Sequence, residues 1–505
     1  MMNRREFLKS AGILFSSPIL LANPFAGDKP GGNIKKPNIV FIMTDQQFAE
    51  AMSCRMGSEY INTPAMDSLA ANGVLFSRAY TANPLCMPAR NSIFTGRYPH
   101  ETGVTANAKP KGGRLSPEFV FMGTYLRNAQ YKTAYCGKWH ICLDINDQKA
   151  HGFEILKKHK VTPPEDNNYD SRISQAAVEF LRQKHEQPFL LVVSLLNPHN
   201  ICEWARRLAG REQKLSCGEI GTPPKSDLLP PPPENLEVPK NESDTMITLR
   251  KAYQVPTGKF PVADFTAETW RKDRWGYYRM IEKVDSEIAK VLNALKDANL
   301  EEDTVVIFTS DHGDCAGAHR FNQKTVFYEE SARVPLIISQ KGKTRKAVCD
   351  KLVNTGVDIL PTMCDFAGTQ HPAKLKGLSL KSLALGKPVS EWRDYVVIEN
   401  YMVQTPKVMD GIIPKAQGRM VRSDRFKYCL YQYGNQRESL FDMEHDPLET
   451  ENLAVNPKYR NVLPEHRKLL SEFADQYNDS LPGEMLAGNV SARPFPNEPQ
   501  KRRHS

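Results

Sequence analysis

The sequence predicts an α/β fold in which a mostly parallel central sheet is flanked by helices. Three continuous apolar, β-branched runs, at 38–43, 189–196 and 304–309, are typical of strands buried on both faces. Apolar residues at three- and four-residue spacing predict an amphipathic helix over residues 275–300. Strands that alternate with helices in this way favour a parallel sheet.

Polar side chains follow each of these three strands. Asp45 comes after the first strand, His199 after the second, and Asp311 and His312 after the third. In open α/β sheets, ligands bind outside the carboxyl ends of the strands. We therefore expect these four side chains to converge on one site.

The pattern changes in the last quarter of the chain, where the expected strands are shorter. We predict a main domain over 36–390, a small antiparallel sheet-and-helix subdomain over 395–480 and an irregular tail over 481–505. A proline-rich, aperiodic stretch at 201–262 predicts a long surface excursion. The subdomain strands are expected at 395–399, 419–421, 426–431 and 439–442, with a charged helix at 462–477.

The first 27 residues have the pattern of an export signal. Arg4 and Arg5 precede an apolar run at 11–25, and small residues follow it. The run is too short to cross a bilayer, which takes about 20 apolar residues, so a transmembrane protein is not expected. The paired arginines are typical of the twin-arginine signal, and they predict a periplasmic or extracellular protein.

The composition is that of a globular protein with a mild excess of positive charge. Of the 505 residues, 40% are hydrophobic and 25% charged, and 67 Lys and Arg against 58 Asp and Glu give a net charge of +9. This balance favours an anionic ligand. The sequence has no basic stripe interleaved with aromatic residues, which argues against nucleic acid as a partner. The spacing of the ten cysteines leaves open one or two disulfide bridges.

The segment Cys86-Met87-Pro88-Ala89-Arg90 predicts a reactive side chain at the start of a helix. Pro88 suits the first turn of a helix, which would place Cys86 at the N-terminus, where free N–H groups favour an anion. Arg90 lies four residues on, one turn away on the same face, from where it can reach back to the Cys86 side chain. A thiol in this position would be acidified.

The stretch CMPARNSIFTGR, at 86–97, resembles the formylglycine signature of type I sulfatases, a family of the alkaline phosphatase superfamily. In that family the cysteine is oxidised after translation to formylglycine (3-oxoalanine). Further segments are similar to the family's motifs in the same order. They are PNIVFIMTDQ (37–46), GKWH (137–140), NPHN (197–200), SDHGDCAGAH (310–319), NQK (322–324) and two C-terminal segments, RSDRFKY (422–428) and LFDMEHDPLETENLA (440–454).

The resemblance implies a divalent cation held by Asp45, Asp311, His312 and an oxygen of the modified residue 86. Such an oxygen-rich set suits Ca²⁺, while Mg²⁺ and Mn²⁺ remain alternatives. Gln46 and His312 depart from many family members and resemble the choline-sulfatase and phosphonate-monoester-hydrolase branches. Gln46 is expected to be a weak ligand or a hydrogen-bond donor to the ligands.

The resemblance also implies catalytic roles for six residues. The hydrate of the modified Cys86 is the nucleophile that attacks sulfur, and Asp311 is the candidate to accept its proton. His199 would act as the general acid towards the leaving alcohol, and His140 as the base that releases sulfate. The cationic groups expected to hold the modified residue and the sulfate oxygens are Arg90, Lys138 and Lys324.

The expected activity is release of inorganic sulfate from a sulfated sugar, after a cytoplasmic sulfatase-maturing enzyme has modified Cys86. The alternatives on the same site are a choline-sulfatase-like enzyme and a phosphonate or phosphate monoester hydrolase. An alternative of a different class is a non-catalytic glycan-binding protein in which Cys86 is never oxidised.

Overall fold

The computed structural model describes residues 36–108, 115–116, 118–158, 169–254, 260–370, 375–402 and 416–487. The predicted signal peptide at 1–27 lies outside the described residues, as does most of the predicted tail. In the described part of the chain, no helix is long and apolar enough to span a membrane.

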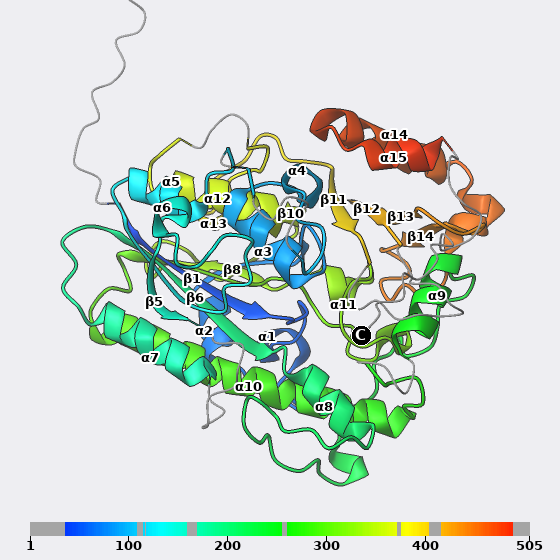
Figure 1. The fold of residues 1–505 in the computed structure, drawn as a ribbon, viewed down its shortest axis with the longest axis horizontal. Coiled ribbons are helices and arrows are strands. Elements are labelled where there is room, and N and C mark those ends of the chain that lie inside the picture. The colour runs from blue at the N-terminus through cyan, green and yellow to red at the C-terminus, as the bar shows by residue number, and fades with distance from the viewer. Residues whose placement is uncertain are drawn as a thin grey trace, which may run out of the picture. The chain divides into compact units, whose positions relative to one another are not determined.

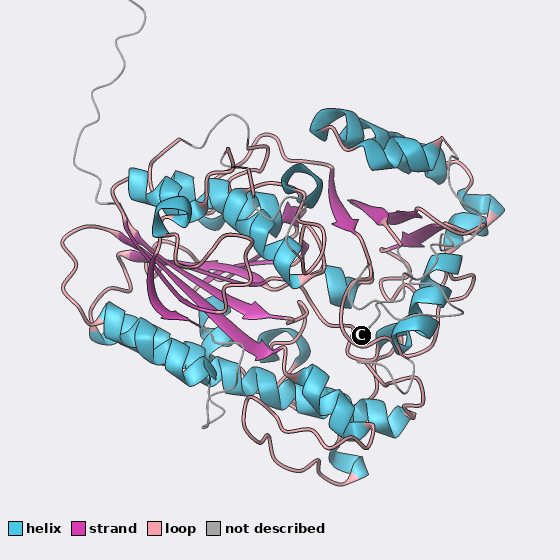
Figure 2. Cartoon of the chain, viewed as in Figure 1, coloured by secondary structure: helices cyan, strands magenta, loops and turns pink. Residues whose placement is uncertain are grey.

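A large central sheet confirms the predicted fold class (Figure 2). The strand order is β5-β4-β6-β1-β7-β8-β2-β9. The five strands from β5 to β7 are parallel to one another, and β8 is antiparallel to β7. The strands span Asn38–Asp45 (β1), Gly73–Phe76 (β2), Lys132–Gly137 (β4), Glu154–Lys158 (β5), Phe189–Pro198 (β6), Thr304–Ser310 (β7), Leu336–Ser339 (β8) and Ala347–Cys349 (β9).

Strand β1 shows why the central strands are continuously apolar. Val40 and Ile42 belong to the hydrophobic core on one face of the sheet, and Phe41 and Met43 to the core on the other face. Because both faces are covered, every position of the strand has to be apolar. The polar residues begin only where the strand leaves the two cores, at Thr44 and Asp45.

Helices cover both faces of the sheet (Figure 1). One face is covered by α2 (Pro64–Ala71), α7 (Tyr169–Leu181), α8 (Ile201–Leu208) and α10 (Ala267–Asp297), and the other by α3 (Cys86–Thr95), α5 (Met122–Asn128) and α12 (Thr355–Phe366). Helix α10 begins eight residues before the predicted start, because Thr266 caps it by accepting a hydrogen bond from the Thr269 N–H. Short helices are α1 (Ser53–Met56), α4 (Pro99–Thr102), α6 (Gln148–His151), α11 (Glu329–Ala332) and α13 (Lys381–Ala384).

The C-terminal region contains the predicted small antiparallel sheet, β11-β12-β13-β14. Its strands span Tyr395–Asn400, Gly418–Ser423, Phe426–Tyr431 and Glu438–Asp442, and α14 spans Val462–Tyr477. Figure 1 shows α14 beside this sheet. A two-stranded parallel sheet is formed by β3 (Ala79–Tyr80) and β10 (Val353–Asn354). The domain boundary at 390–395 stays a prediction.

Two stretches predicted to be irregular contain helices. Residues Ser480–Leu486 form helix α15 where an irregular tail was expected, because Asp479 caps the Leu481 N–H and the apolar pair Leu481 and Met485 packs into the C-terminal core. The stretch at 201–262 contains α8, a 3₁₀ turn at Ser226–Leu228 and α9 (Asp244–Tyr253). No disulfide bridge joins any two of the ten cysteines, all of which lie in the described part of the chain, so the one or two bridges left open by the sequence are not formed.

Candidate active site

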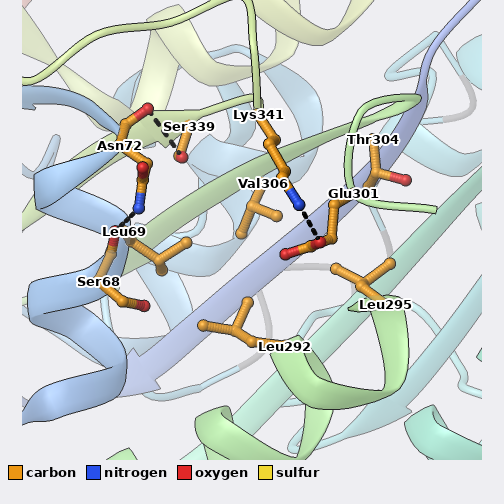
Figure 3. Close-up of a pocket in the computed structure, with 10 residues that line it drawn as sticks. All are labelled: Ser68, Leu69, Asn72, Leu292, Leu295, Glu301, Thr304, Val306, Ser339 and Lys341. Atoms are coloured by element: carbon orange, nitrogen blue, oxygen red, sulfur yellow. Dashed lines mark hydrogen bonds and ion pairs between the residues drawn. The ribbon is translucent and has the colours of Figure 1, made fainter. Parts of the chain in front are cut away.

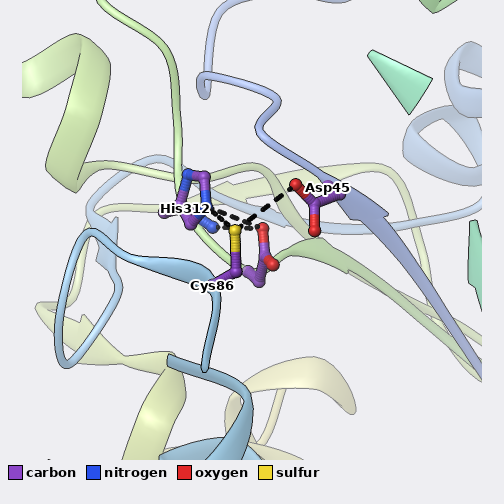
Figure 4. Close-up of side chains that lie close together, drawn as sticks. Asp45, Cys86 and His312 are labelled. Carbon is purple, nitrogen blue, oxygen red and sulfur yellow. Dashed lines mark hydrogen bonds and ion pairs between the residues drawn. The ribbon is translucent and has the colours of Figure 1, made fainter. Parts of the chain in front are cut away.

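Helix α3 presents Cys86 at its first position, as predicted. Leu85 is extended (φ −150°, ψ 136°) and Pro88 lies within the first turn, which needs no N–H at that position. The Cys86 side chain is buried, and its Sγ lies 3.1 Å from His312 Nε2 and 3.8 Å from Asp45 Oδ1 (Figure 4). The helix N-terminus therefore points a single reactive side chain at the carboxyl ends of the strands.

Strands β1 and β7 bring the two carboxylates together. The strands are adjacent and parallel, with Thr44 paired to Ser310, so Asp45 and Asp311 leave the sheet side by side. Both side chains are fully buried. Their ligand atoms, with Cys86 Sγ and a His312 ring nitrogen, all lie within 4.8 Å of one another.

Arg90 holds this pair of carboxylates in place. Its Nε donates to Asp311 Oδ2 and its Nη2 to Asp45 Oδ2, both at 2.8 Å, and its Nη1 donates to Ser194 Oγ (2.8 Å) and the Lys138 carbonyl (3.1 Å). The guanidinium is fully buried. The sequence placed Arg90 one turn from Cys86, but its hydrogen bonds go to the two carboxylates, because a planar fork of donors matches a pair of acids better than a thiol.

The neighbouring charges shift the pKa values of the two acids in opposite directions. Burial raises the pKa of Asp45, but Lys138, His199 and Arg90 outweigh burial and hold it well below its usual range. Burial and the charge of Asp45 raise the pKa of Asp311. One carboxylate is thus fixed as an anion, while its neighbour is the easier of the two to protonate.

Two lysines place positive charge around Cys86. Lys138 Nζ donates to Asp45 Oδ2 at 2.5 Å, and Lys324 Nζ lies 3.1 Å from Cys86 Sγ and 2.6 Å from Gln46 Oε1. Burial and Asp45 raise the pKa of the Cys86 thiol, but Lys138, Lys324 and His312 outweigh them and lower it well below its usual value. These cationic groups would stabilise a negatively charged nucleophile at this position.

The orientation of His312 fits a metal ligand. Its Nδ1 lies 2.9 Å from the Gly313 carbonyl and donates to it, which leaves the lone pair of Nε2 facing Cys86. A ligating histidine commonly has its other ring nitrogen held in this way. Two carboxylates, one imidazole and the side chain of residue 86 make a donor set that fits a divalent cation.

His199 and His140 complete the set of nine predicted residues. Burial, Lys138 and Lys324 lower the pKa of His199 to about 4, so its ring is neutral at pH 7 in the free protein. An anionic ester near the two lysines would offset their charge and raise that pKa. Burial also lowers the pKa of His140, whose Nδ1 is buried without a hydrogen-bond partner. A hydrogen bond to the Cys86 side chain raises the pKa of both rings, but it does not outweigh burial.

The structure adds three residues that sequence reasoning did not identify. Asp314 Oδ2 accepts a 2.5 Å hydrogen bond from Gln46 Nε2, and Tyr277 Oη donates to the Gln46 carbonyl at 2.7 Å. Ser194 supports Arg90. Asp314 follows His312 by two positions and offered a signal in the sequence, whereas Ser194 and Tyr277 lie within apolar patterns that gave none.

The chain matches known proteins over most of its length. Residues 37–369 match the family model described as Sulfatase, and residues 317–476 match the model for N-sulphoglucosamine sulphohydrolase, C-terminal. A Delta 4,5-hexuronate-2-O-sulfatase of Bacteroides thetaiotaomicron is 30% identical over 458 residues, which cover 88% of this chain and 90% of that protein.

Two further comparisons also match the chain to sulfatases. A choline-sulfatase of Rhizobium meliloti is 27% identical over 468 residues, covering 84% of this chain and 83% of that protein. The solved structure of a 2-O GAG sulfatase superposes with a TM-score of 0.77 at 28% identity, covering 93% of this chain and 97% of that one.

The fold and the buried ligand cluster define an α/β enzyme of the alkaline phosphatase superfamily. Within that superfamily, the matches over residues 37–369 and to full-length relatives are decisive. The chain belongs to the sulfatase family, and it is a sulfatase, an enzyme that hydrolyses sulfate esters.

Proposed function

We propose that the protein releases inorganic sulfate from a sulfated carbohydrate, with formylglycine at position 86 and one divalent cation. The observation that carries the proposal is the buried cluster of Asp45, Cys86, Asp311 and His312 at the N-terminus of α3. The expected cation is Ca²⁺, with Mn²⁺ and Mg²⁺ as alternatives, because carboxylate oxygens make up much of the donor set. When bound, the cation would supply positive charge that stabilises anionic oxygens.

The surrounding residues are suited to bind and neutralise a sulfate group. Lys324 and Lys138 place ammonium groups beside residue 86. Charges in a water-excluded site act more strongly than at the surface, and hydrogen bonds to neighbouring groups fix both ammonium groups. Arg90 orients the two carboxylates, and its four described hydrogen bonds all go to groups of the protein.

The two histidines are suited to move protons beside residue 86, since both rings interact with the Cys86 side chain. We assign His199 to protonate the oxygen of the leaving alcohol, because bound sulfate would raise its pKa at the moment the acid is needed. We assign His140 to accept the proton that is lost when sulfate is released, since its Nδ1 is buried and unpartnered and its ring is neutral.

A sulfated sugar is favoured as the substrate by the relatives and by the charge. The first relative above acts, by its name, on a hexuronate 2-O-sulfate, and the net charge of +9 attracts an anionic substrate. The choline-sulfatase relative keeps a choline-sulfatase-like activity as the second candidate, and a phosphonate or phosphate monoester hydrolase is the third. A glycan-binding protein with an unmodified Cys86 is the alternative of a different class.

We further propose that the protein is exported after modification. The paired Arg4 and Arg5 support a twin-arginine signal, and that route carries folded proteins, which suits a residue modified in the cytoplasm by a sulfatase-maturing enzyme. A periplasmic or extracellular location follows from this proposal. Comparing the N-terminus and location of the wild type with those of Arg4→Lys/Arg5→Lys would test it, and equal export of both would contradict the twin-arginine route.

The modification is tested by mass spectrometry of the tryptic peptide 79–90, from protein made with and without a sulfatase-maturing enzyme. We expect the thiol of Cys86 to be replaced by an aldehyde only in the first sample. The matured protein is then assayed on a hexuronate 2-O-sulfated disaccharide, choline sulfate, an aryl sulfate and an aryl phosphonate, with Cys86→Ala as the control. Preference for choline sulfate or phosphonate would overturn the carbohydrate proposal, and equal turnover by Cys86→Ala would overturn the catalytic role of residue 86.

A further inference from the structure

A pocket of about 510 Å³ lies away from the active site, between β11, α14 and the turn that follows α3. Tyr98, at the C-terminal end of that turn, lines the pocket, whereas Cys86 lies at the N-terminal end of α3. A ten-residue helix is about 15 Å long, so the pocket and the nucleophile are at opposite ends of the same helix. The volume is within the range of small-molecule sites, roughly 300–1,000 Å³.

Aromatic rings form a packed wall of this pocket. The Tyr98 ring meets the Tyr477 ring edge-on at 4.9 Å between centroids, and the Phe473 ring at 5.0 Å. The Phe473 and Tyr477 rings lie 4.7 Å apart with 31° between their planes. Trp392 lines the pocket from the segment that leads into β11, and Tyr395 lines it from the first position of that strand. The rings of Tyr98, Phe473 and Tyr477 therefore hold one another in place.

Three phenol groups of this wall face the pocket. The hydroxyls of Tyr98, Tyr395 and Tyr477 are in no hydrogen bond found among the described residues, and none of them is a buried atom left without a partner. They are therefore open to water or to a ligand in the pocket, and a ligand that covers them has to replace that water with its own hydrogen bonds. Burial raises the pKa of Tyr98 well above its usual value and that of Tyr477 to about 12, so both remain hydroxyls that donate and accept.

The charges at the pocket do not favour an anion. Lys376 is matched by the exposed acids Glu391 and Asp394, and the guanidinium of Arg393 is already paired with the buried Asp358 through two hydrogen bonds of 2.6 Å. A purely apolar ligand would leave the three hydroxyls unpaired. The remaining ligand class is one with an apolar face for the rings and several neutral hydroxyl groups for the phenols, which is the chemistry of a sugar ring.

A second pocket of about 170 Å³ shows the contrast (Figure 3). It lies at the far end of β7, and its polar groups are already paired: Lys341 Nζ with Glu301 at 2.6 Å, and Ser339 Oγ with the Asn72 carbonyl at 3.3 Å. It contains no aromatic side chain among its described lining residues. The paired Lys341 and Ser339 side chains therefore offer a ligand no free polar group.

We propose that the aromatic pocket is a second carbohydrate-binding site, which holds one or two neutral sugar units of a glycan chain apart from the unit at the active site. The proposal goes beyond the hydrolytic function and does not depend on which sulfate ester is cleaved. A site of this kind would raise the local concentration of a polymeric substrate and leave the turnover of small substrates unchanged.

The test uses the full-length matured protein and the variant Tyr395→Phe/Tyr477→Phe, which keeps the rings and removes two hydroxyls. Affinity electrophoresis is run through gels that contain a neutral β-glucan or a neutral galactomannan, probes that carry no sulfate ester for the active site and no charge. We expect retardation of the wild type in at least one gel and at least tenfold weaker binding by the variant. Tyr459→Phe, in the same region but outside the pocket, should bind like the wild type.

Three results would overturn the proposal. They are equal retardation of the variant and the wild type, absence of retardation of the wild type in both gels, and wild-type self-association in sedimentation that the variant loses, which would make a second copy of the chain the occupant. Turnover of an aryl sulfate is measured in parallel. Loss of glycan binding with unchanged turnover separates this proposal from the proposed catalytic function, because each can then fail without the other.

Discussion

Arg90 and Asp45 form a 2.8 Å ion pair in which neither side chain is exposed to solvent. Two carboxylates, those of Asp45 and Asp311, share this one guanidinium. Without it, two buried like charges would lie side by side, and each would be costly to keep ionised. The arginine therefore holds the two acids of the ligand set together, with their side chains aligned for a shared cation.

The first prediction concerns Arg90→Met, which keeps much of the side-chain volume and removes the charge. Removing one partner of a buried ion pair leaves an uncompensated charge, and we expect a loss of about 3–5 kcal/mol in the free energy of unfolding. We also expect turnover per folded molecule to fall at least a hundredfold, because the carboxylates would lose their alignment. Urea unfolding and an aryl sulfate assay measure the two effects.

Arg419→Met provides the matched control. Arg419 is also fully buried and paired with two acids, Asp479 at 2.6 Å and Glu399 at 3.7 Å, but it lies in the C-terminal sheet. It should lose a similar amount of stability and keep its turnover per folded molecule. If both variants lost turnover equally, the effect of Arg90→Met would be general unfolding and not disassembly of the site.

The second prediction concerns removal of the cation. A ligand that binds only the folded state stabilises it, by about 2.7 kcal/mol at a concentration a hundred times its dissociation constant. Adding Ca²⁺ to chelator-treated protein should therefore raise Tm, and the rise should be largely lost in Asp311→Asn, which removes one anionic ligand of the cluster. Calorimetric melting with Ca²⁺, Mn²⁺ and Mg²⁺ in turn would rank the ions. A Tm that no divalent cation changes would contradict the proposed metal site.

The third prediction concerns Gly137, which directly precedes Lys138. Its φ is +110°, and a Cβ there would lie 2.0 Å from the Ser194 carbonyl oxygen. Gly137→Ala should therefore displace Lys138 and Ser194 together, with a loss of stability and of turnover. Gly210→Ala is the control, since Gly210 also has a positive φ (+77°) but has open space around it. It should cost about 1–3 kcal/mol of backbone strain at most and leave turnover intact.

The sequence predicted the fold well where a local pattern determines it. The continuous apolar run at 38–43 indicated a doubly buried strand, and β1 packs into both cores. Helix α14 has its predicted bounds because the apolar face repeats with helical spacing. The prediction of an irregular tail was wrong at 480–486, because the short helix α15 depends on Asp479 as a cap and on packing that only the tertiary structure supplies.

The site was predictable to the extent that its residues lie at strand ends and in short motifs. Asp45, Asp311 and His312 could be inferred to converge because parallel strands end at one edge of the sheet. The role of Ser194 could not be inferred, since it lies inside the apolar strand β6 and supports Arg90 from a distant part of the chain. The tyrosines of the aromatic pocket come from α14, β11 and the turn after α3, and no sequence pattern links them.

The fourth prediction concerns the pH dependence of stability and the pair of His100 and Glu399. His100 Nδ1 lies 2.5 Å from Glu399 Oε1, and its Nε2 lies 3.0 Å from the Tyr477 carbonyl. Burial lowers the pKa of His100, but the Glu399 carboxylate outweighs burial and raises it to about 9, above the value near 6.5 in the unfolded chain. The pair therefore stabilises the fold fully below pH 6.5, and this contribution is lost as the pH rises through 9.

The size of this contribution is on the order of 3 kcal/mol, which corresponds to the difference between the two pKa values. His100→Asn, which keeps a hydrogen-bonding side chain without the titrating ring, should be less stable than the wild type at pH 6 and should approach it at pH 10. Tm measured for both proteins across this range isolates the pair, because all other groups titrate alike in the two. A difference between wild type and variant that stays constant from pH 6 to 10 would show that His100 contributes packing and not charge.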